Sequence, residues 1–238
     1  MKKIEIVPWL AEKLSIPLEI DEKNLHVATS AFIAILITIV AIIAWRRLRK
    51  TDDNIIPSRK LSAATIFELV VESVLHLMED IIGPGAKKYF PLIGTLFIYI
   101  LCCDLIGAVP GFIPPTSNIN TNLACAICVF LYYNYAGIRE RGFLKYIKHM
   151  AGPVIWLAPL MLTIELTSHL VRPISLSVRL FGNMVGDHMV LEIFSDLVPF
   201  LVPIVFMSLT IFVAFIQAFV FTLLSTVYIA LATQSEDH

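Results

Sequence analysis

The chain has 238 residues, of which 58% are hydrophobic and 16% are charged, and its formal net charge is −1. Soluble domains are usually about 45–50% apolar and about 25% charged. The composition therefore excludes an ordinary soluble domain and predicts one all-helical integral membrane domain over residues 1–238. A net charge near zero also argues against nucleic acid as a partner.

Residues 1–26 are polar to mixed and lack the order of regions found in a cleaved signal peptide. We expect them to form an external N-terminal segment, with the first apolar helix acting as its own insertion signal. Residues 27–45 are long and apolar enough to form the first span. Trp45 is followed by the basic cluster 46–50. An aromatic residue before a basic cluster is typical of the cytoplasmic interface, which places the N-terminus outside.

Residues 61–82 have the pattern of an amphipathic helix on the cytoplasmic side of the membrane. Apolar residues recur there at helical spacing, while glutamates fall on the opposite side. The apolar positions are Ile66, Val70, Val74, Leu77 and Ile81, and the acidic ones are Glu68, Glu72 and Glu79. Such a helix is expected to lie on the membrane or on a partner without crossing.

Residues 90–109 and 122–136 predict a spanning hairpin whose turn, around residues 110–115, lies outside. The hairpin returns the chain to a second basic region that begins with Arg139 and Arg141. Both basic regions then lie on the cytoplasmic side, as the positive-inside rule requires. The C-terminal tail is also expected on the cytoplasmic side.

The last two apolar segments, residues 160–196 and 203–232, are too long for simple spans. As helices they would measure about 55 Å and about 45 Å, whereas the hydrocarbon core is about 30 Å thick. Each must be broken or strongly tilted, and together they predict an oblique helix hairpin. The prediction is therefore about five membrane-embedded helices plus one amphipathic surface helix.

A polar stripe marks the first of these long segments. At 100° per residue from Glu165, polar and charged residues follow at steps of three or four along one face. They are Ser168, His169, Arg172, Ser175, Arg179, Asn183 and Asp187. A charge in hydrocarbon costs at least about 2.5–3.5 kcal/mol, so such a stripe must face a bundle interior, a water-filled cavity or a partner.

The two arginines of the stripe have different surroundings in the sequence. Arg172 has Glu165 seven residues away, so this pair either stabilises the bundle or edges a channel. Arg179 has no acidic residue three or four positions away on its own helix. Because an arginine is never deprotonated in a protein, Arg179 is expected to meet a carboxylate from elsewhere.

Three further features allow two interpretations each. Gly182 and Gly186, at a four-residue spacing, permit close approach of a helix from this chain or from a separate subunit. Gln217 either holds the last two helices together or lines the polar path. Cys125 and Cys128 form a C-x-x-C inside an apolar segment. Small apolar packing explains these cysteines better than a metal site, and none is predicted.

The run Arg172-Pro-Ile-Ser-Leu-Ser-Val-Arg179-Leu-Phe-Gly-Asn-Met184 closely resembles the signature of subunit a of F-type ATP synthases, bacterial type. The resemblance covers nearly the whole chain. It includes the amphipathic helix after the first span, the turn 104–111, and the segment 217–221.

This resemblance implies a role for each matched residue. Arg179 corresponds to the arginine that faces the carboxylate of the rotating c-ring and separates two aqueous half-channels. Glu165 falls where the family has an acid of the cytoplasmic half-channel. Asn183 and Gln217 fall at polar positions beside the arginine and the outer half-channel, and His188 stands where many bacterial members carry Glu.

The chain departs from the family pattern on its last helix. Members often have an ionisable partner for the His188 position there, but the aligned position lies near Thr210. The outer path is therefore expected to use His188 with a different acid. The candidates are Asp187, Glu192, Asp196 and Asp104.

The implied function is that of a proton-translocating stator subunit, not an enzyme on its own, in a bacterial inner membrane. The implied partners are the c-ring, the b-subunit peripheral stalk, the remaining ATP synthase subunits, the lipid bilayer and protons. A sodium-coupled version is the alternative, and a stand-alone secondary transporter is disfavoured because no internal repeat is visible. The sequence has no G-x-x-x-x-G-K-[ST] loop, and no cofactor is expected.

Overall fold

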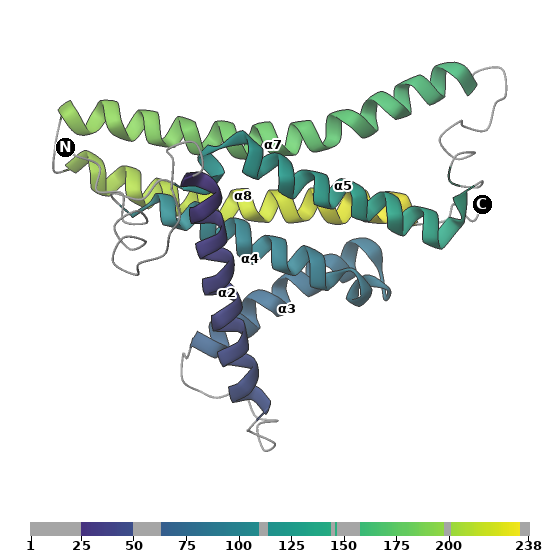
Figure 1. Ribbon diagram of the computed structural model, residues 1–238, viewed down its shortest axis with the longest axis horizontal. Coiled ribbons are helices and arrows are strands. Elements are labelled where there is room, and N and C mark those ends of the chain that lie inside the picture. Colours follow the sequence, from purple (N-terminus) through teal and green to yellow (C-terminus); the bar gives the residue numbers. More distant parts are fainter. Residues whose placement is uncertain are drawn as a thin grey trace. The chain divides into compact units, whose positions relative to one another are not determined.

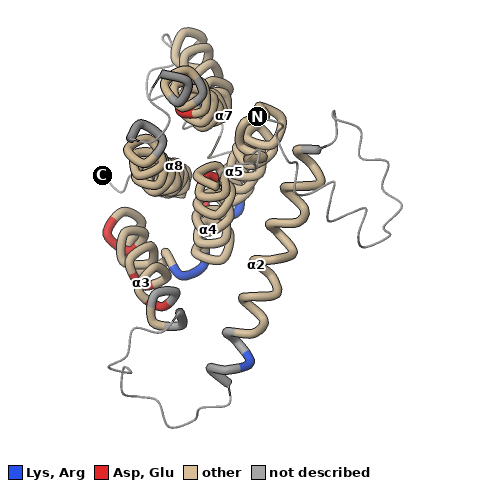
Figure 2. Tube along the Cα trace, turned by 90° about the vertical axis from the view of Figure 1, so that its left-hand side faces the viewer, with Lys and Arg blue, Asp and Glu red and all other residues tan. Residues whose placement is uncertain are grey.

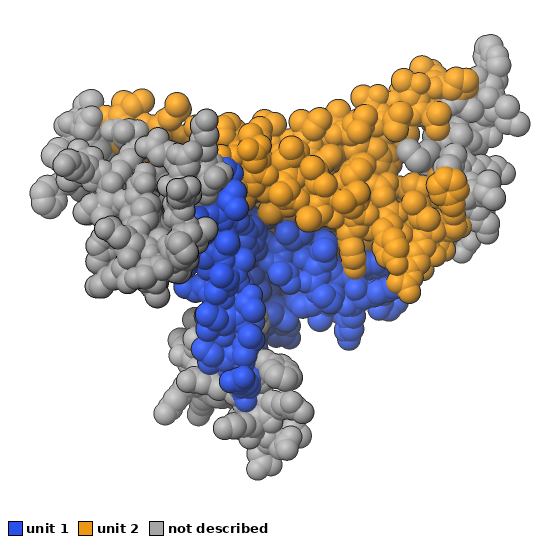
Figure 3. Space-filling model, in the orientation of Figure 1, with its two compact units in different colours: residues 1–115 blue, residues 116–238 orange. Residues whose placement is uncertain are grey.

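The computed structural model describes residues 25–49, 63–109, 114–143, 146, 158–197 and 201–233. Every regular element within these ranges is helical (Figure 1). The elements are α2 (Leu25–Arg49), α3 (Ala63–Ile82), η2 (Ala86–Lys88), α4 (Phe90–Gly107), η3 (Pro115–Ser117), α5 (Ile119–Arg141), α7 (Ala158–Leu197) and α8 (Leu201–Thr233). They form two compact units, Met1–Pro115 and Thr116–His238 (Figure 3).

In the first unit, α2 packs against α4 over a short region near its N-terminal end. The hydroxyl groups of Ser30 and Tyr99 form a hydrogen bond between the two helices. Ile33 is buried, whereas Ile35 and Ile39 are exposed. The apolar surface that α2 leaves uncovered is what a helix surrounded by lipid requires.

The α3 helix has the predicted amphipathic character. Val74 and Met78 are buried, and acidic residues mark one side of the helix (Figure 2). Gly83 follows α3 with a φ of +90°, a conformation that glycine adopts without steric cost and that commonly ends a helix. The position of α3 on the membrane surface stays a prediction.

The second unit consists of α5, α7 and α8 packed side by side, with α7 and α8 antiparallel (Figure 1). Its core includes Val129 and Tyr133 of α5, Leu180 of α7, and Phe221 of α8. Asn118 caps α5, because its side-chain oxygen accepts a hydrogen bond from the backbone N–H of Asn120. This helix bundle presents the predicted polar stripe.

The described part of the chain contains four helices long and apolar enough to cross a membrane. They comprise His26–Ile43, Phe90–Gly107, Ile119–Arg141 and Ile204–Thr233. The fifth helix predicted to be embedded, α7, is not among them, because its charged residues interrupt the apolar sequence. The described part of the chain is thus all-helical, with four helices able to cross a membrane, while the embedding of α7 stays a prediction.

The structure excludes one of the two interpretations of the long apolar segments, a broken helix or a tilted one. With 40 residues, α7 continues through Pro173, so the interpretation of a broken helix is wrong for this segment. Pro173 has no N–H to offer to the carbonyl of His169, and its own carbonyl accepts a hydrogen bond from Ser177 Oγ at 2.8 Å. The 33 residues of α8 are likewise one helix, and the predicted tilt remains untested.

Several predictions fall on residues outside the described ranges. These are the external location of residues 1–24, the turn at residues 110–113, and the cytoplasmic tail 234–238. The predicted single domain over residues 1–238 stays a prediction beside the two compact units.

The end of α5 is fastened to the end of α8. Arg141 donates to the carbonyl oxygen of Leu231 at 3.1 Å, which supplies a donor to a C-terminal helix turn that lacks one. Nearby, Tyr146 donates its O–H to Asn134 Oδ1 at 2.9 Å. Burial raises the pKa of Tyr146 above its usual value, so the phenol remains a donor at neutral pH.

Gly137 lies where the end of α5 meets the end of α8, and a substitution there tests this contact. A Cβ at Gly137 would lie 2.7 Å from Tyr146 Cε2 and 3.1 Å from the Ala232 carbonyl oxygen. Tyr146 cannot move aside without losing its bond to Asn134, so Gly137→Ala should separate α5 from α8. Overpacking costs about 1–3 kcal/mol, and we expect a lower midpoint of thermal unfolding, measured by circular dichroism in detergent.

The matched control is Gly186→Ala, on α7, where an added Cβ would meet no atom within 4 Å. This variant should keep or raise the unfolding midpoint, since alanine favours helix by about 1 kcal/mol over glycine. Equal midpoints for the two variants would contradict the close packing at Gly137.

Candidate functional site

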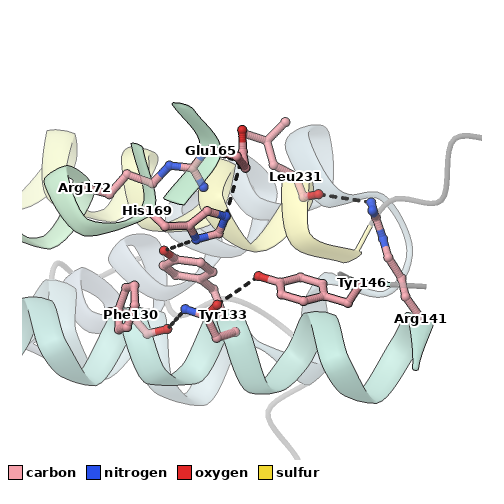
Figure 4. A network of polar contacts seen from close by, with 9 residues as sticks. Phe130, Tyr133, Arg141, Tyr146, Glu165, His169, Arg172 and Leu231 are labelled. Carbon is pink, nitrogen blue, oxygen red and sulfur yellow. Dashed lines mark hydrogen bonds and ion pairs between the residues drawn. The ribbon is translucent and has the colours of Figure 1, made fainter. Parts of the chain in front are cut away.

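A chain of polar side chains connects α5 to α7 (Figure 4). The phenol oxygen of Tyr133 lies 3.0 Å from Nδ1 of His169, and Nε2 of the same imidazole lies 3.3 Å from Oε1 of Glu165. Tyr133 and His169 are buried, at 1% and 7% exposure, whereas Glu165 is half-buried. The imidazole therefore has one nitrogen against α5 and the other against the carboxylate.

Arg172, one turn after His169 on α7, also belongs to this cluster. Its Nη2 lies 3.6 Å from Glu165 Oε1, and its guanidinium carbon lies 5.1 Å from the centre of the Tyr228 ring on α8. A cation over an aromatic face is attracted by the ring quadrupole. The expected pairing of Arg172 with Glu165 is thus present. The cluster around this pair also includes Tyr133 of α5 and Tyr228 of α8.

Arg179 has a different environment, two turns further along α7. Its side chain is exposed, and it makes no ion pair or hydrogen bond with any other residue that the structure describes. Ser175, one turn earlier, is also exposed. One arginine of the stripe is therefore satisfied inside the chain, and the other is presented at its surface.

Beyond Arg179, an amide pair links α7 to α8. Asn183 donates from Nδ2 to Oε1 of Gln217 at 2.6 Å, and Gln217 is buried at 4% exposure. The interpretation of Gln217 as a residue that holds the last two helices together is therefore supported by a direct contact. Its part in a polar path stays a prediction.

The two glycines beside Arg179 are open. An ideal Cβ at Gly182 or Gly186 would meet no atom within 4 Å. Close packing of these glycines against another helix of this chain is therefore wrong for the described residues. The other interpretation, contact of these glycines with a separate subunit, stays a prediction.

The structure brings only some of the predicted outer-path residues together. His188 and Asp187 are half-buried neighbours on α7, which also carries Glu192. Asp104 is buried on α4, in the first unit, so its pairing with His188 stays a prediction. Thr210 is buried on α8 and donates its hydroxyl to the carbonyl of Phe206, as hydroxyl side chains in apolar helices commonly do.

The predicted single stripe is divided by the fold. Its first part turns toward α5 and α8, and its middle part faces outward. Ser168, His169 and Arg172 are buried or half-buried, Ser175, Arg179 and Asn183 are exposed, and Asp187 is half-buried. Residues seven apart drift by about 20° around an α-helix, so a line through Glu165, Arg172 and Arg179 winds away from the bundle.

Tyr133 is the residue of the site that the sequence pattern did not indicate. It belongs to the run Tyr132-Tyr133-Asn134-Tyr135 within an otherwise apolar span. Polar side chains inside a span are commonly functional, so this run indicates that one of its residues has a role. The sequence does not show which of the four side chains points toward α7.

The sequence is similar to known proteins over most of its length. The family model described as ATP synthase A chain matches residues 28–230. ATP synthase subunit a of Bdellovibrio bacteriovorus is 45% identical over 213 residues, covering 90% of this chain and 93% of its own. ATP synthase subunit a 1 of Syntrophotalea carbinolica is 48% identical over 205 residues, covering 86% and 84%.

A third relative, ATP synthase subunit a of Geobacter sulfurreducens, is 44% identical over 218 residues and is covered at 91% of both chains. The match of the family model spans most of the sequence, from the first helix to the end of α8. The chain therefore belongs to the ATP synthase A chain family.

Proposed function

We propose that this chain is the ion-conducting stator subunit of a rotary ATP synthase, coupling proton flow to rotation of a ring of c subunits. The observation that carries the proposal is the exposed guanidinium of Arg179, which has no partner among the described residues. A permanent cation in an apolar environment requires an anion nearby. Here that anion belongs to another protein, the carboxylate of the ring.

The proposed mechanism follows from the charge of Arg179. A proton that enters from one side neutralises a ring carboxylate, and the neutral subunit can rotate into lipid. On reaching the second half-channel the carboxylic acid releases its proton. Arg179 favours the ionised carboxylate, since a nearby cation stabilises the charged form of an acid. It cannot relay protons itself because it stays charged.

The energy for rotation comes from the membrane potential. Each elementary charge that crosses yields about 2.3 kcal/mol per 100 mV. Coupling requires that no proton passes directly from one half-channel to the other, and Arg179 separates them. We assign Glu165 to the inner half-channel. His188, with Asp187, Glu192 or Asp104, is assigned to the outer one, and Asn183 and Gln217 lie beside the separator.

The remaining features of the proposal concern assembly and orientation. The peripheral stalk holds the chain against the ring, the N-terminus lies outside, and the C-terminus is cytoplasmic in a bacterial inner membrane. In this arrangement α7 and α8 form an oblique hairpin that follows the ring. Nucleotide chemistry belongs to other subunits, and sodium in place of protons remains the alternative coupling ion.

The Arg179→Ala variant tests the separator directly. We expect ATP-driven proton pumping and coupled ATP synthesis to be abolished, because no cation then drives release from the ring carboxylate. Assembly should be retained, since Arg179 makes no ion pair or hydrogen bond inside the described chain. The measurement is pumping and synthesis by the intact complex in lipid vesicles.

Arg139→Ala provides the control, because it removes an exposed arginine near the end of α5. It should leave both activities close to those of the unmodified complex. Normal coupled synthesis in the Arg179→Ala complex would refute the assignment.

The His188→Ala variant tests the outer path. Histidine titrates between about pH 5 and 8, so removing His188 should slow proton translocation and flatten its dependence on outer pH across that range. His76→Ala, on the exposed side of α3, is the matched control. If the rate and the pH profile of His188→Ala equal those of the control, His188 has no part in the path.

A further inference from the structure

The three-residue contact between Tyr133, His169 and Glu165 has a defined direction for its protons. An ionised carboxylate only accepts hydrogen bonds, so the imidazole nitrogen that faces Glu165 must carry a proton. In a neutral imidazole the other nitrogen is then an acceptor. In that neutral tautomer, Tyr133 donates its O–H to Nδ1 across the observed 3.0 Å.

We propose that Tyr133 is a positioning residue of the inner proton path, which keeps His169 neutral with its single proton on Nε2, directed at Glu165. The inference rests on the proposed inner-path role of Glu165. It adds to that role a residue from α5, a helix outside the polar stripe. The distance from Nε2 to Oε1, 3.3 Å, is just beyond the usual range of about 2.7–3.2 Å, so a small side-chain movement completes the bond.

The arrangement makes Glu165 a transient rather than a lasting proton acceptor. When the ring carboxylic acid reaches the inner side, its O–H bond breaks and an O–H bond forms on Glu165. Glu165 then passes that proton to water and returns to the carboxylate. His169 keeps its one proton throughout, and its Nε2 and the Arg172 guanidinium both face the carboxylate of Glu165.

Few other described groups near Tyr133, His169 and Glu165 could change the charge of Glu165. Among the described residues, Arg172 lies on α7, Tyr228 on α8, and Arg141 and Tyr146 at the end of α5. Arg172 is charged at every relevant pH. Among the described residues, His169 is thus the group near Glu165 whose protonation near neutral pH would alter that carboxylate. Tyr133 contacts the nitrogen at which a second proton would bind.

The Tyr133→Phe variant removes the donor and retains the ring, which packs against Phe130, His169 and Tyr228. Nδ1 is then free to bind a proton, or the imidazole can turn a bare nitrogen toward the carboxylate. Both changes strengthen proton binding by the Glu165–His169 pair. We therefore expect the midpoint of ATP synthesis against inner pH to move up by about one pH unit.

The measurement uses the intact complex in lipid vesicles. The pH on the side to which the inner half-channel opens is varied, while the pH on the other side and the membrane potential are held fixed. Tyr135→Phe is the matched control, since it removes a phenol O–H from an exposed position on the same helix. That variant should keep the midpoint of the unmodified complex.

The His169→Gln variant separates positioning from packing. Its amide nitrogen can occupy the place of Nε2 and donate to Glu165, but the amide does not titrate. Tyr133→Phe should therefore shift the midpoint in the unmodified background and leave it unshifted in the His169→Gln background. An unshifted midpoint for Tyr133→Phe alone, or an equal shift in both backgrounds, would overturn the proposal.

The Glu165→Gln variant distinguishes this inference from the function on which it rests. If the dependence on inner pH persists without the carboxylate, the inner-path role of Glu165 is wrong. If that dependence is lost, but Tyr133→Phe has no effect on the midpoint, the role of Glu165 stands and the positioning role of Tyr133 fails.

Discussion

The surroundings of the two arginines on α7 are the constraint on which the function of this molecule depends. A permanent cation in hydrocarbon must find a counter-charge or water, since its charge cannot be removed by losing a proton. Arg172 meets this requirement inside the chain, through Glu165 and the face of Tyr228. Arg179 is exposed and makes no ion pair with any other described residue, and under the proposed function its counter-charge comes from a partner.

The other polar contacts of the second unit are consistent with this difference between Arg172 and Arg179. Before Arg179, His169 contacts Tyr133 of α5 and Arg172 contacts Tyr228 of α8. After it, the amide of Asn183 is held by Gln217. The neighbouring glycines leave the surface next to the arginine open. Arg179 is therefore an exposed cation beside glycines that face open space.

Much of this fold could be predicted from the sequence, for identifiable reasons. Apolar length predicted the spans, and the bounds of α4, α7 and α8 lie within about two residues of the expected ones, since Pro and Gly punctuate them. The continuity of α7 could not be predicted, because a proline inside a helix is compatible with a kink, a break or a continuous helix. The division of the polar stripe into a buried and an exposed part also could not be predicted. A helical wheel does not show which side of a helix the neighbouring helices cover. The contribution of Tyr133 depended on the rotation of α5, which its apolar pattern leaves undefined. Outside the described residues, the turn and terminal segments remain predictions.

The most direct test of the central claim is the passive proton permeability of vesicles that contain the intact complex with the Arg179→Ala substitution. A pH gradient is imposed without ATP, and its decay is followed with a pH-sensitive dye, with the unmodified complex as reference. If Arg179 separates two half-channels, its removal should open a direct route, and the gradient should decay faster than in the reference. A gradient that persists as long as in the reference, together with normal ATP-driven pumping, would contradict the role of Arg179 as the separator.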